Sequence, residues 1–211
     1  MFGFIREFLE ALRRYDERSS VANEFDGYGF MKRVYGIESM PRFETVAKLA
    51  RTDTLTQLYN RMAFDELIIK EMAASDRYGN PLSVTVFNID NFRQLNHDHS
   101  FMACDQLIKD VARVMQDQVR TADILFRWYS DEFLLILPHT DLDAAVIACE
   151  KSRKVIEAHD FGEIGKITCS FGVLQYRKGD TIDSMLKALD SSLQRAKKAG
   201  KNRIEVIRRE Q

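Results

Sequence analysis

The sequence is poor in cysteine and has no long apolar segment. Its three cysteines, Cys104, Cys149 and Cys169, are widely spaced and form no Cys-x-x-Cys pair, which argues against a disulfide framework and a cysteine-ligated zinc site. No apolar run approaches the roughly 20 residues that a membrane-spanning helix needs, and the first residues lack the charged-then-apolar order of a signal peptide. These absences predict a cytoplasmic protein without a transmembrane segment.

An excess of either charge is also missing. The chain has 31 Lys and Arg residues against 32 Asp and Glu residues, so its net charge is −1. This balance provides no global attraction for nucleic acid or an anionic membrane, and any anion must therefore bind locally. The 211 residues, of which 45% are apolar and 30% charged, are typical of one globular domain with an appendage.

The appendage is N-terminal. Residues 1–15 place Phe8, Leu12 and other apolar side chains on one helical face, which predicts an amphipathic helix. Such a helix could support dimerisation, contact a protein partner or lie on a membrane, but its mixed charges favour packing on its own domain or the next segment. Residues 16–40 have no clear period and predict a linker. We therefore expect an N-terminal helical extension over residues 1–50 and a domain over residues 51–208.

The hydrophobic periodicity of the domain predicts alternating strands and helices. From residue 82 the predicted order is β-α-β-β-α-β, followed by one more helix and strand, which is a ferredoxin-like layout. The fold class is therefore α/β (an α+β sandwich), with a central, mainly antiparallel sheet flanked by helices. The expected strands cover residues 82–89, 124–128, 133–137, 167–176 and 204–207, and the expected helices cover residues 61–77, 102–119, 141–158 and 181–198.

The most informative stretch is residues 119–138, VRTADILFRWYSDEFLLILP. Two apolar runs joined by the polar residues Tyr129-Ser130-Asp131-Glu132 predict a β-hairpin with two carboxylates at its tip, facing solvent at a sheet edge. The two acids could bind a cation or transfer a proton, although solvated charges at a tip would give the same pattern.

This hairpin resembles the RYGGDEF hairpin of the GGDEF domains, the bacterial diguanylate cyclases. The DEF letters are kept, whereas Tyr129 and Ser130 replace the two glycines. Residues 53–61, DTLTQLYNR, resemble the family's DxLTGLxNR motif with Gln57 at the glycine, and residues 88–96, NIDNFRQLN, resemble its DxDxFKxxN motif. The resemblance covers about residues 53–206 and implies the ferredoxin-like palm of nucleotidyl cyclases.

The resemblance also implies roles for acidic and amide side chains. Asp131 and Glu132 match the catalytic acids, and Asp131 and Asn88 match the two ligands of a catalytic Mg²⁺ or Mn²⁺. Asn88 stands where the family has aspartate, and its neutral amide would weaken the metal site; an inactive domain would need no cofactor. Asn96 and Asp105 match the residues that bind the guanine edge, with Phe101 and Cys104 expected to narrow that pocket.

Basic residues complete the implied sites. Lys197 and Lys201 match the phosphate grip of the family's AKxxGRNR string, although cations at a helix C-terminus are also favoured by the macrodipole alone. Arg120 and Asp123 match the inhibitory RxxD site for cyclic di-GMP. The nearby His97-Asp98-His99 cluster predicts a surface loop rather than a metal site.

The departures from the family pattern concentrate on the hairpin tip, one metal ligand and the base-pocket turn. The sequence therefore favours a degenerate GGDEF domain of cyclic di-GMP signalling that is catalytically impaired and binds a nucleotide or a protein. The alternative is an active diguanylate cyclase that condenses two GTP molecules as a homodimer. The expected partners are GTP or cyclic di-GMP, a second copy of the chain, and a protein bound through the N-terminal helix, but not nucleic acid.

Overall fold

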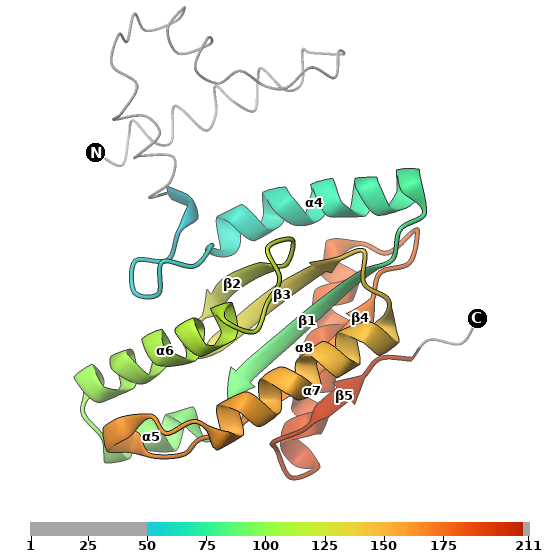
Figure 1. Cartoon of the computed structure of the whole chain (residues 1–211). Coiled ribbons are helices and arrows are strands. Elements are labelled where there is room, and N and C mark those ends of the chain that lie inside the picture. Colours follow the sequence, from blue (N-terminus) through green and yellow to red (C-terminus); the bar gives the residue numbers. More distant parts are fainter. Residues whose placement is uncertain (1–49, 209–211) are drawn as a thin grey trace, which may run out of the picture. The chain divides into compact units, whose positions relative to one another are not determined.

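The computed structural model describes residues 50–208, which belong to one compact unit (Figure 1). These residues form a five-stranded sheet with the strand order β2-β3-β1-β4-β5. Neighbouring strands are antiparallel except for β4 and β5, which are parallel, as expected for a mainly antiparallel sheet. The strands are β1 (Leu82–Ile89), β2 (Ile124–Tyr129), β3 (Glu132–Pro138), β4 (Cys169–Gln175) and β5 (Ile204–Val206).

Helices cover both faces of the sheet (Figure 1). Helices α6 (Phe101–Gln116) and α7 (Leu142–Ala158) pack on one face, and α4 (Arg61–Tyr78) and α8 (Ile182–Lys198) pack on the other. The short helix α5 (Phe92–Asp98) follows β1 and contacts α6, while a 3₁₀ turn, η1 (Gly162–Ile164), follows α7. The sheet is therefore the middle of three layers, with a separate apolar core on each face.

Local sequence signals explain where the long helices begin. Each begins after a residue whose side-chain oxygen accepts a hydrogen bond from the backbone N–H three positions later, which satisfies one of the free donors of the first turn. These N-cap residues are Asn60 before α4, Ser100 before α6, Asp141 before α7 and Thr181 before α8. Such signals lie in the sequence itself, so the helix positions could be predicted closely.

Strand β1 is buried along its whole length and needs partners for its polar side chains. Ser83 donates a hydrogen bond to the carbonyl of Thr140, and the hydroxyl of Thr85 lies 3.4 Å from Cys149 Sγ. Cys149 is 2% exposed and is part of the apolar core. On β4, a side chain at Gly172 would collide with Ser192 Oγ, so the glycine allows α8 to pack closely on the sheet.

The predicted order of helices and strands is confirmed, with three differences in detail. Helix α5 is an additional element, and it contains His97 and Asp98, so the predicted surface loop at these residues is wrong, although His97 is exposed. Helix α6 ends at Gln116 rather than at residue 119, and β4 begins at Cys169 rather than at residue 167. The predicted N-terminal extension over residues 1–50, with its helix over residues 1–15 and its linker over residues 16–40, lies outside the described residues except for residue 50. In the described part of the chain, no helix is long and apolar enough to cross a membrane.

Candidate functional site

The hairpin of β2 and β3 has a shorter tip than the sequence predicts. Only Ser130 and Asp131 lie in the turn, because Tyr129 belongs to β2, Glu132 belongs to β3, and the two residues pair with each other. Ser130 has a φ of +42°, in the left-handed region that favours glycine. The tip therefore keeps a glycine-type backbone at the second replaced position. At the first, Tyr129 presents a ring that is 75% exposed.

A second family glycine position shows the same behaviour. Gln57 has a φ of +61°, and its side-chain amide donates to the carbonyl of Thr54 at 3.0 Å. Asp53 closes this turn, because its carboxylate accepts from both the N–H and the hydroxyl of Thr56 at 2.8 Å. The backbone of this turn therefore remains in a glycine-type conformation without the glycine.

An ion pair ties this turn to the hairpin. Arg127 on β2 donates to both carboxylate oxygens of Asp53, at 3.0 and 3.2 Å, and to the carbonyl of Ser130 at 2.9 Å. Burial raises the pKa of Asp53, but the hydrogen bonds from Thr56 and Arg127 outweigh it and hold the pKa below its usual value. Arg127 therefore fixes the tip. Sequence reasoning missed this role, although Arg127 precedes the YSDEF run at the position of the family's arginine.

The two hairpin acids do not face solvent as predicted. Asp131 and Glu132 are half-buried, because Glu132 lies opposite Asn88 of the central strand β1. Burial raises the pKa of Glu132 to about 7, with Asp190 and Asp131 adding to the shift and Lys197 opposing it. Burial also raises the pKa of Asp131, against the opposing effects of Asn88, Lys197 and Arg127. The prediction overlooked that β3 is an interior strand of the sheet.

The raised pKa of Glu132 predicts a pH-dependent stability. Because the folded pKa of about 7 exceeds the ordinary value of 4.5, this group contributes most to stability below pH 4.5, and the contribution falls as the pH rises to 7. Allowing for residual solvent screening, we expect a loss of about 1 to 2 kcal/mol between pH 4.5 and 8. Denaturant unfolding of the wild type and Glu132→Gln at both pH values measures it. The Gln variant should lose this component, whereas the exposed control Asp183→Asn should keep it; equal pH dependence in wild type and Glu132→Gln would contradict the assignment.

The predicted metal ligands offer an incomplete donor set. Asn88 is 6% exposed, and its Nδ2 donates to the backbone carbonyl of Asp131 at 3.4 Å, so its amide N–H rather than its oxygen faces the hairpin. Within residues 50–208, no group of three or more His, Cys, Asp or Glu side chains is arranged to hold a metal. Hard divalent cations prefer several charged oxygen ligands. The residues at the hairpin therefore do not fit a preformed magnesium site.

The predicted phosphate-binding lysines lie in different local structures. Lys197 is in the last turn of α8. Its positive charge partly offsets the rise that burial causes in the pKa of Asp131 and of Glu132. Lys201 lies beyond the end of α8 with a φ of +64°, so the two lysines are held by different parts of the backbone. The ammonium of Lys201 donates to Asn91 Oδ1 at 2.6 Å, which ties it to the turn after β1.

The predicted guanine-binding residues lie on two contacting helices. Asn96 on α5 and Asp105 on α6 are both exposed, and neither side chain makes a hydrogen bond to another described residue. Phe101 lies one turn before Asp105 on α6 and is 84% exposed. Cys104 is 2% exposed and belongs to the core between α6 and the sheet. The expectation that Cys104 narrows a base pocket is therefore wrong, because its side chain packs inward.

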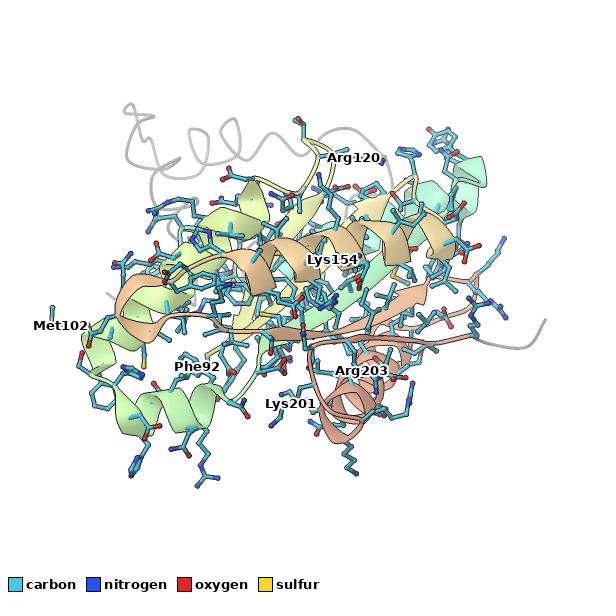
Figure 2. All side chains as sticks on the ribbon, turned by 60° about the horizontal axis from the view of Figure 1, so that its bottom comes forward. Phe92, Met102, Arg120, Lys154, Lys201 and Arg203 are labelled. Carbon is cyan, nitrogen blue, oxygen red and sulfur yellow. The ribbon has the colours of Figure 1, made fainter. Side chains whose placement is uncertain are left out.

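The predicted inhibitory residues form a local turn before β2. The carboxylate of Asp123 accepts from the backbone N–H of Arg120 at 2.8 Å, and the N–H of Asp123 donates to the carbonyl of Arg120 at 3.0 Å. The side chain of Arg120 projects from the surface, well away from Lys201 (Figure 2). The turn therefore presents an exposed arginine beside a carboxylate.

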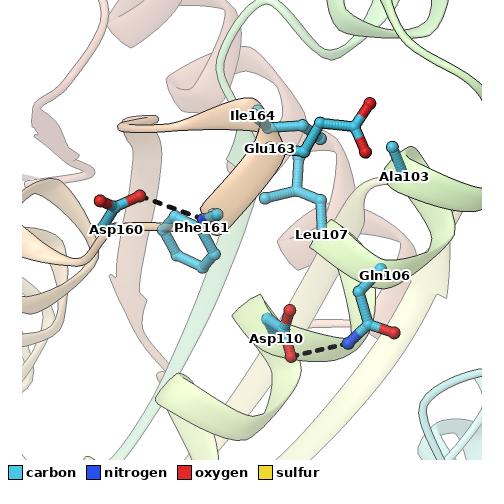
Figure 3. A pocket seen from close by; sticks show the side chains of 9 residues that line it. Ala103, Gln106, Leu107, Asp110, Asp160, Phe161, Glu163 and Ile164 are labelled. Carbon is cyan, nitrogen blue, oxygen red and sulfur yellow. Dashed lines mark hydrogen bonds between the residues drawn. The ribbon is translucent and has the colours of Figure 1, made fainter.

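A small hollow of about 240 Å³ lies between α6 and the segment of residues 160–164 (Figure 3). Leu107, Phe161 and Ile164 contribute apolar atoms, while Asp110 and Asp160 already accept hydrogen bonds from Gln106 and from the N–H of Gly162. None of the residues predicted for metal, nucleotide or cyclic di-GMP lines it. The candidate site is therefore the open surface around the hairpin tip rather than this hollow.

The sequence also predicted no role for Asp90, which follows β1 directly. This carboxylate is 4% exposed and accepts from the hydroxyls of Thr168 and Ser170, both at 2.7 Å, and from the N–H of Asn202 at 3.0 Å. It joins the end of β1, the start of β4 and the turn after α8. The sequence shows Asp90 as the acid of the run Asn88-Ile89-Asp90. It does not show the three groups that donate to Asp90, because they lie 78 to 112 residues further along the chain.

Comparisons with known proteins agree with this architecture. The sequence model of the family described as "Diguanylate cyclase, GGDEF domain" matches residues 50–203. The chain is 34% identical over 184 residues to diguanylate cyclase DgcP of Pseudomonas aeruginosa, which covers 83% of this chain and 27% of that protein. It is also 34% identical over 165 residues to diguanylate cyclase VdcA of Vibrio cholerae, covering 75% of this chain and 48% of that protein. The chain thus spans less than half the length of either relative.

Among solved structures, the coiled coil and GGDEF domain of DgcB from Caulobacter crescentus, in complex with c-di-GMP, superposes with a TM-score of 0.76 and 25% identity over 86% of this chain and 96% of that one. Diguanylate cyclase SiaD of Pseudomonas aeruginosa, in complex with its activator SiaC, gives a TM-score of 0.73 and 26% identity over 98% of this chain and 76% of that one. Sequence motifs, fold and family match thus agree, and the chain belongs to the GGDEF domain family.

Proposed function

We propose that this chain is a catalytically impaired GGDEF domain that acts in cyclic di-GMP signalling as a nucleotide-binding or protein-interaction module. The observation that carries the proposal is Asn88, whose amide N–H faces the hairpin where the family has a metal-binding carboxylate. Condensing two GTP molecules requires a 3′-hydroxyl to attack an α-phosphate, and divalent metal neutralises the developing charge. With Asn88, the site lacks one negative charge for that metal.

The hairpin tip supports the same conclusion. A glycine tip lets phosphate approach the backbone N–H groups closely, whereas Tyr129 and Ser130 add side chains at both glycine positions. The pKa of Glu132, raised to about 7, also means that a metal would compete with a proton at this half-buried acid. Both effects disfavour binding of GTP with its metal in the geometry needed for reaction.

An active diguanylate cyclase is the alternative, and two observations favour it. Ser130 keeps the left-handed backbone of the replaced glycine, and Lys197 lies near both hairpin acids, as a phosphate-binding cation would. In that case the chain would act as a homodimer with Mg²⁺ or Mn²⁺, because each subunit presents one GTP.

Mass spectrometry for cyclic di-GMP, after incubation of the whole chain with GTP and Mg²⁺ and then with Mn²⁺, decides between the two. Manganese is included because it accepts an oxygen ligand set of lower charge. We expect no product above that of a Lys197→Ala control. Product well above the control in either metal would overturn the proposal and establish the alternative.

A cyclic di-GMP site at Arg120 and Asp123 would supply the regulatory function. The exposed guanidinium of Arg120 can bind a phosphate or stack on a guanine, and the carboxylate of Asp123 can accept from a guanine edge. The related DgcB structure holds c-di-GMP, which makes this ligand the first to test.

We predict that Arg120→Ala weakens cyclic di-GMP binding by at least about tenfold, because it removes a charge-assisted contact to phosphate. Isothermal titration calorimetry of the wild type and the variant measures the effect. Arg113→Ala on α6 is the matched control, since Arg113 is also exposed and its only ion pair within residues 50–208 is with Asp110. Equal affinity of the wild type and Arg120→Ala would place the ligand elsewhere, and no binding by the wild type would leave the protein-interaction function.

The remaining expected partners are also part of the proposal. SiaD is solved with its activator SiaC, which supports a protein partner for this chain, and residues 1–15 are the segment we propose for it. We likewise propose a homodimer and a cytoplasmic location. Light scattering on the whole chain and on a chain that begins at residue 50 tests whether the N-terminal extension is needed for the dimer.

A further inference from the structure

A half-buried polar network joins α7 to the turn that carries Lys201. Its centre is Arg153, whose side chain is only 12% exposed. The Arg153 guanidinium donates to both carboxylate oxygens of Glu150 at 2.8 Å and to Glu157 Oε2 at 3.0 Å. Its Nη1 also donates to Asn202 Oδ1 at 2.6 Å. The largely buried Arg153 thus donates hydrogen bonds to two acids of its own helix and to the side-chain amide of a residue in a distant turn.

Asn202 closes this network and extends it to the sheet. Its Nδ2 donates to Glu157 Oε1 at 2.7 Å, and its backbone N–H donates to Asp90 Oδ2 at 3.0 Å. The side chain therefore both accepts from Arg153 and donates to Glu157, which fixes its orientation. Through Asn202, α7 is connected to the end of β1.

The turn that this network holds has an unfavourable backbone. Gly200, Lys201 and Asn202 have φ values of +115°, +64° and +47°, so two successive residues with side chains occupy the left-handed region. Such residues persist only where the surrounding contacts hold them. The hydrogen bonds of Asn202 with Arg153, Glu157 and Asp90 serve this purpose. A further contact is the hydrogen bond from Lys201 Nζ to Asn91.

We propose that Arg153 is a positioning residue of the nucleotide site: it holds Asn202, and through Asn202 it holds the backbone that places the ammonium of Lys201 beside the β1 end. Arg153 itself lies on α7 and has no role in the family motifs described above. The inference rests on the proposed function for the identity of the ligand, GTP or another nucleotide, but the positioning itself can be measured in the ligand-free protein.

Hydrogen exchange of the ligand-free chain is the direct test. The N–H of Lys201 donates to the carbonyl of Ala196, and the N–H of Asn202 donates to Asp90, so both amides report on the turn. In Arg153→Met we expect these two amides to exchange at least about tenfold faster, while amides of the β1–β3 ladder change by less than about twofold. Arg113→Met is the control, because Arg113 is a 71% exposed arginine of α6 whose one ion pair in the described part of the chain is with Asp110.

A second variant, Asn202→Gly, distinguishes the loss of the side-chain hydrogen bonds from the effects of backbone strain and of misfolding. Asn202→Gly accepts the left-handed backbone and keeps the N–H to Asp90, but it loses both side-chain hydrogen bonds. We expect it to accelerate exchange at the same two amides as Arg153→Met. Unchanged exchange at Lys201 and Asn202 in either folded variant, or equal acceleration throughout the sheet, would overturn the positioning role.

The ligand arm uses GTP with Mg²⁺ and calorimetry. If the wild type binds GTP, Arg153→Met and Asn202→Gly should each weaken binding by about tenfold. The melting temperature of Asn202→Gly should stay unchanged. Arg153→Lys should bind GTP more tightly than Arg153→Met, because it keeps the positive charge. If wild-type protein binds no GTP, the nucleotide-binding proposal fails while the exchange result still decides whether Arg153 holds the turn. Wild-type affinity in both variants would overturn the inference.

Discussion

The variant Asn88→Asp, Tyr129→Gly, Ser130→Gly is expected to form cyclic di-GMP from GTP at least about a hundredfold faster than the wild type, because it restores a metal ligand and opens the tip to phosphate. Asn88 lies at the end of β1, opposite Glu132 on β3 and Ser170 on β4. An aspartate there adds a third carboxylate beside Asp131 and Glu132. The two glycines remove the exposed ring of Tyr129 and relieve the left-handed strain at Ser130.

The gain in cyclase activity should require a divalent metal, and binding of that metal should also raise the thermal stability of the variant. Burial already raises the pKa of Asp131 and Glu132, so a third nearby carboxylate increases the repulsion in the free protein. We therefore expect Asn88→Asp to melt at a lower temperature than the wild type without metal and to be stabilised by Mg²⁺ or Mn²⁺, whereas the wild type responds little. Product formation is measured by mass spectrometry, and stability by thermal unfolding with and without metal.

The partial variants are the controls. Asn88→Asp alone tests the metal ligand, and Tyr129→Gly with Ser130→Gly tests the tip. If the triple variant gains the metal response but stays inactive, the remaining obstacle is Phe101 at the start of α6 or the lack of a productive dimer, since Cys104 packs into the core. If it gains neither, the assignment of Asn88 to the metal site is wrong.

The fold could be predicted well because its signals are local. The apolar periodicity of α6 and α8 and the two apolar runs of the hairpin each specify an element within a few residues. In the structure, the N-cap residues Ser100 and Thr181 then fix where α6 and α8 begin. The short helix α5 was missed because it has only 7 residues, and its N-cap, Asn91, makes no side-chain capping bond. A helix of this size is stabilised mainly by tertiary contacts such as that of buried Phe92.

The candidate site could be predicted in composition but not in environment. The motifs identify Asp131, Glu132 and Lys197, yet the exposure predicted for the two acids is wrong, because burial depends on which strands lie beside β3. Strand order is a long-range property, and no local pattern contains it. The same holds for Asp53, whose partner Arg127 is 74 residues away. Such contacts form only in the folded chain, and the sequence shows only which side chains are able to make them.

Asp90→Ala is expected to lower the free energy of unfolding by about 3 to 5 kcal/mol, which is among the largest effects of any single substitution in the described domain. The carboxylate is 4% exposed and accepts from the hydroxyls of Thr168 and Ser170 and from the N–H of Asn202. The substitution leaves three donors without their acceptor, and one of them, the hydroxyl of Ser170 on β4, is fully buried. The unpaired groups, more than the lost carboxylate, account for the cost.

Asp90→Asn should cost about half as much, because the amide keeps one acceptor oxygen but turns its NH₂ group toward groups that also donate. Urea unfolding of both variants beside Asp143→Asn, whose side chain is 86% exposed, measures the difference, and the control should change by less than about 0.5 kcal/mol. A cost below about 1 kcal/mol for Asp90→Ala would show that water replaces the carboxylate. The turn after α8 would then be held from the α7 side, through Arg153 and Asn202, rather than from the end of β1.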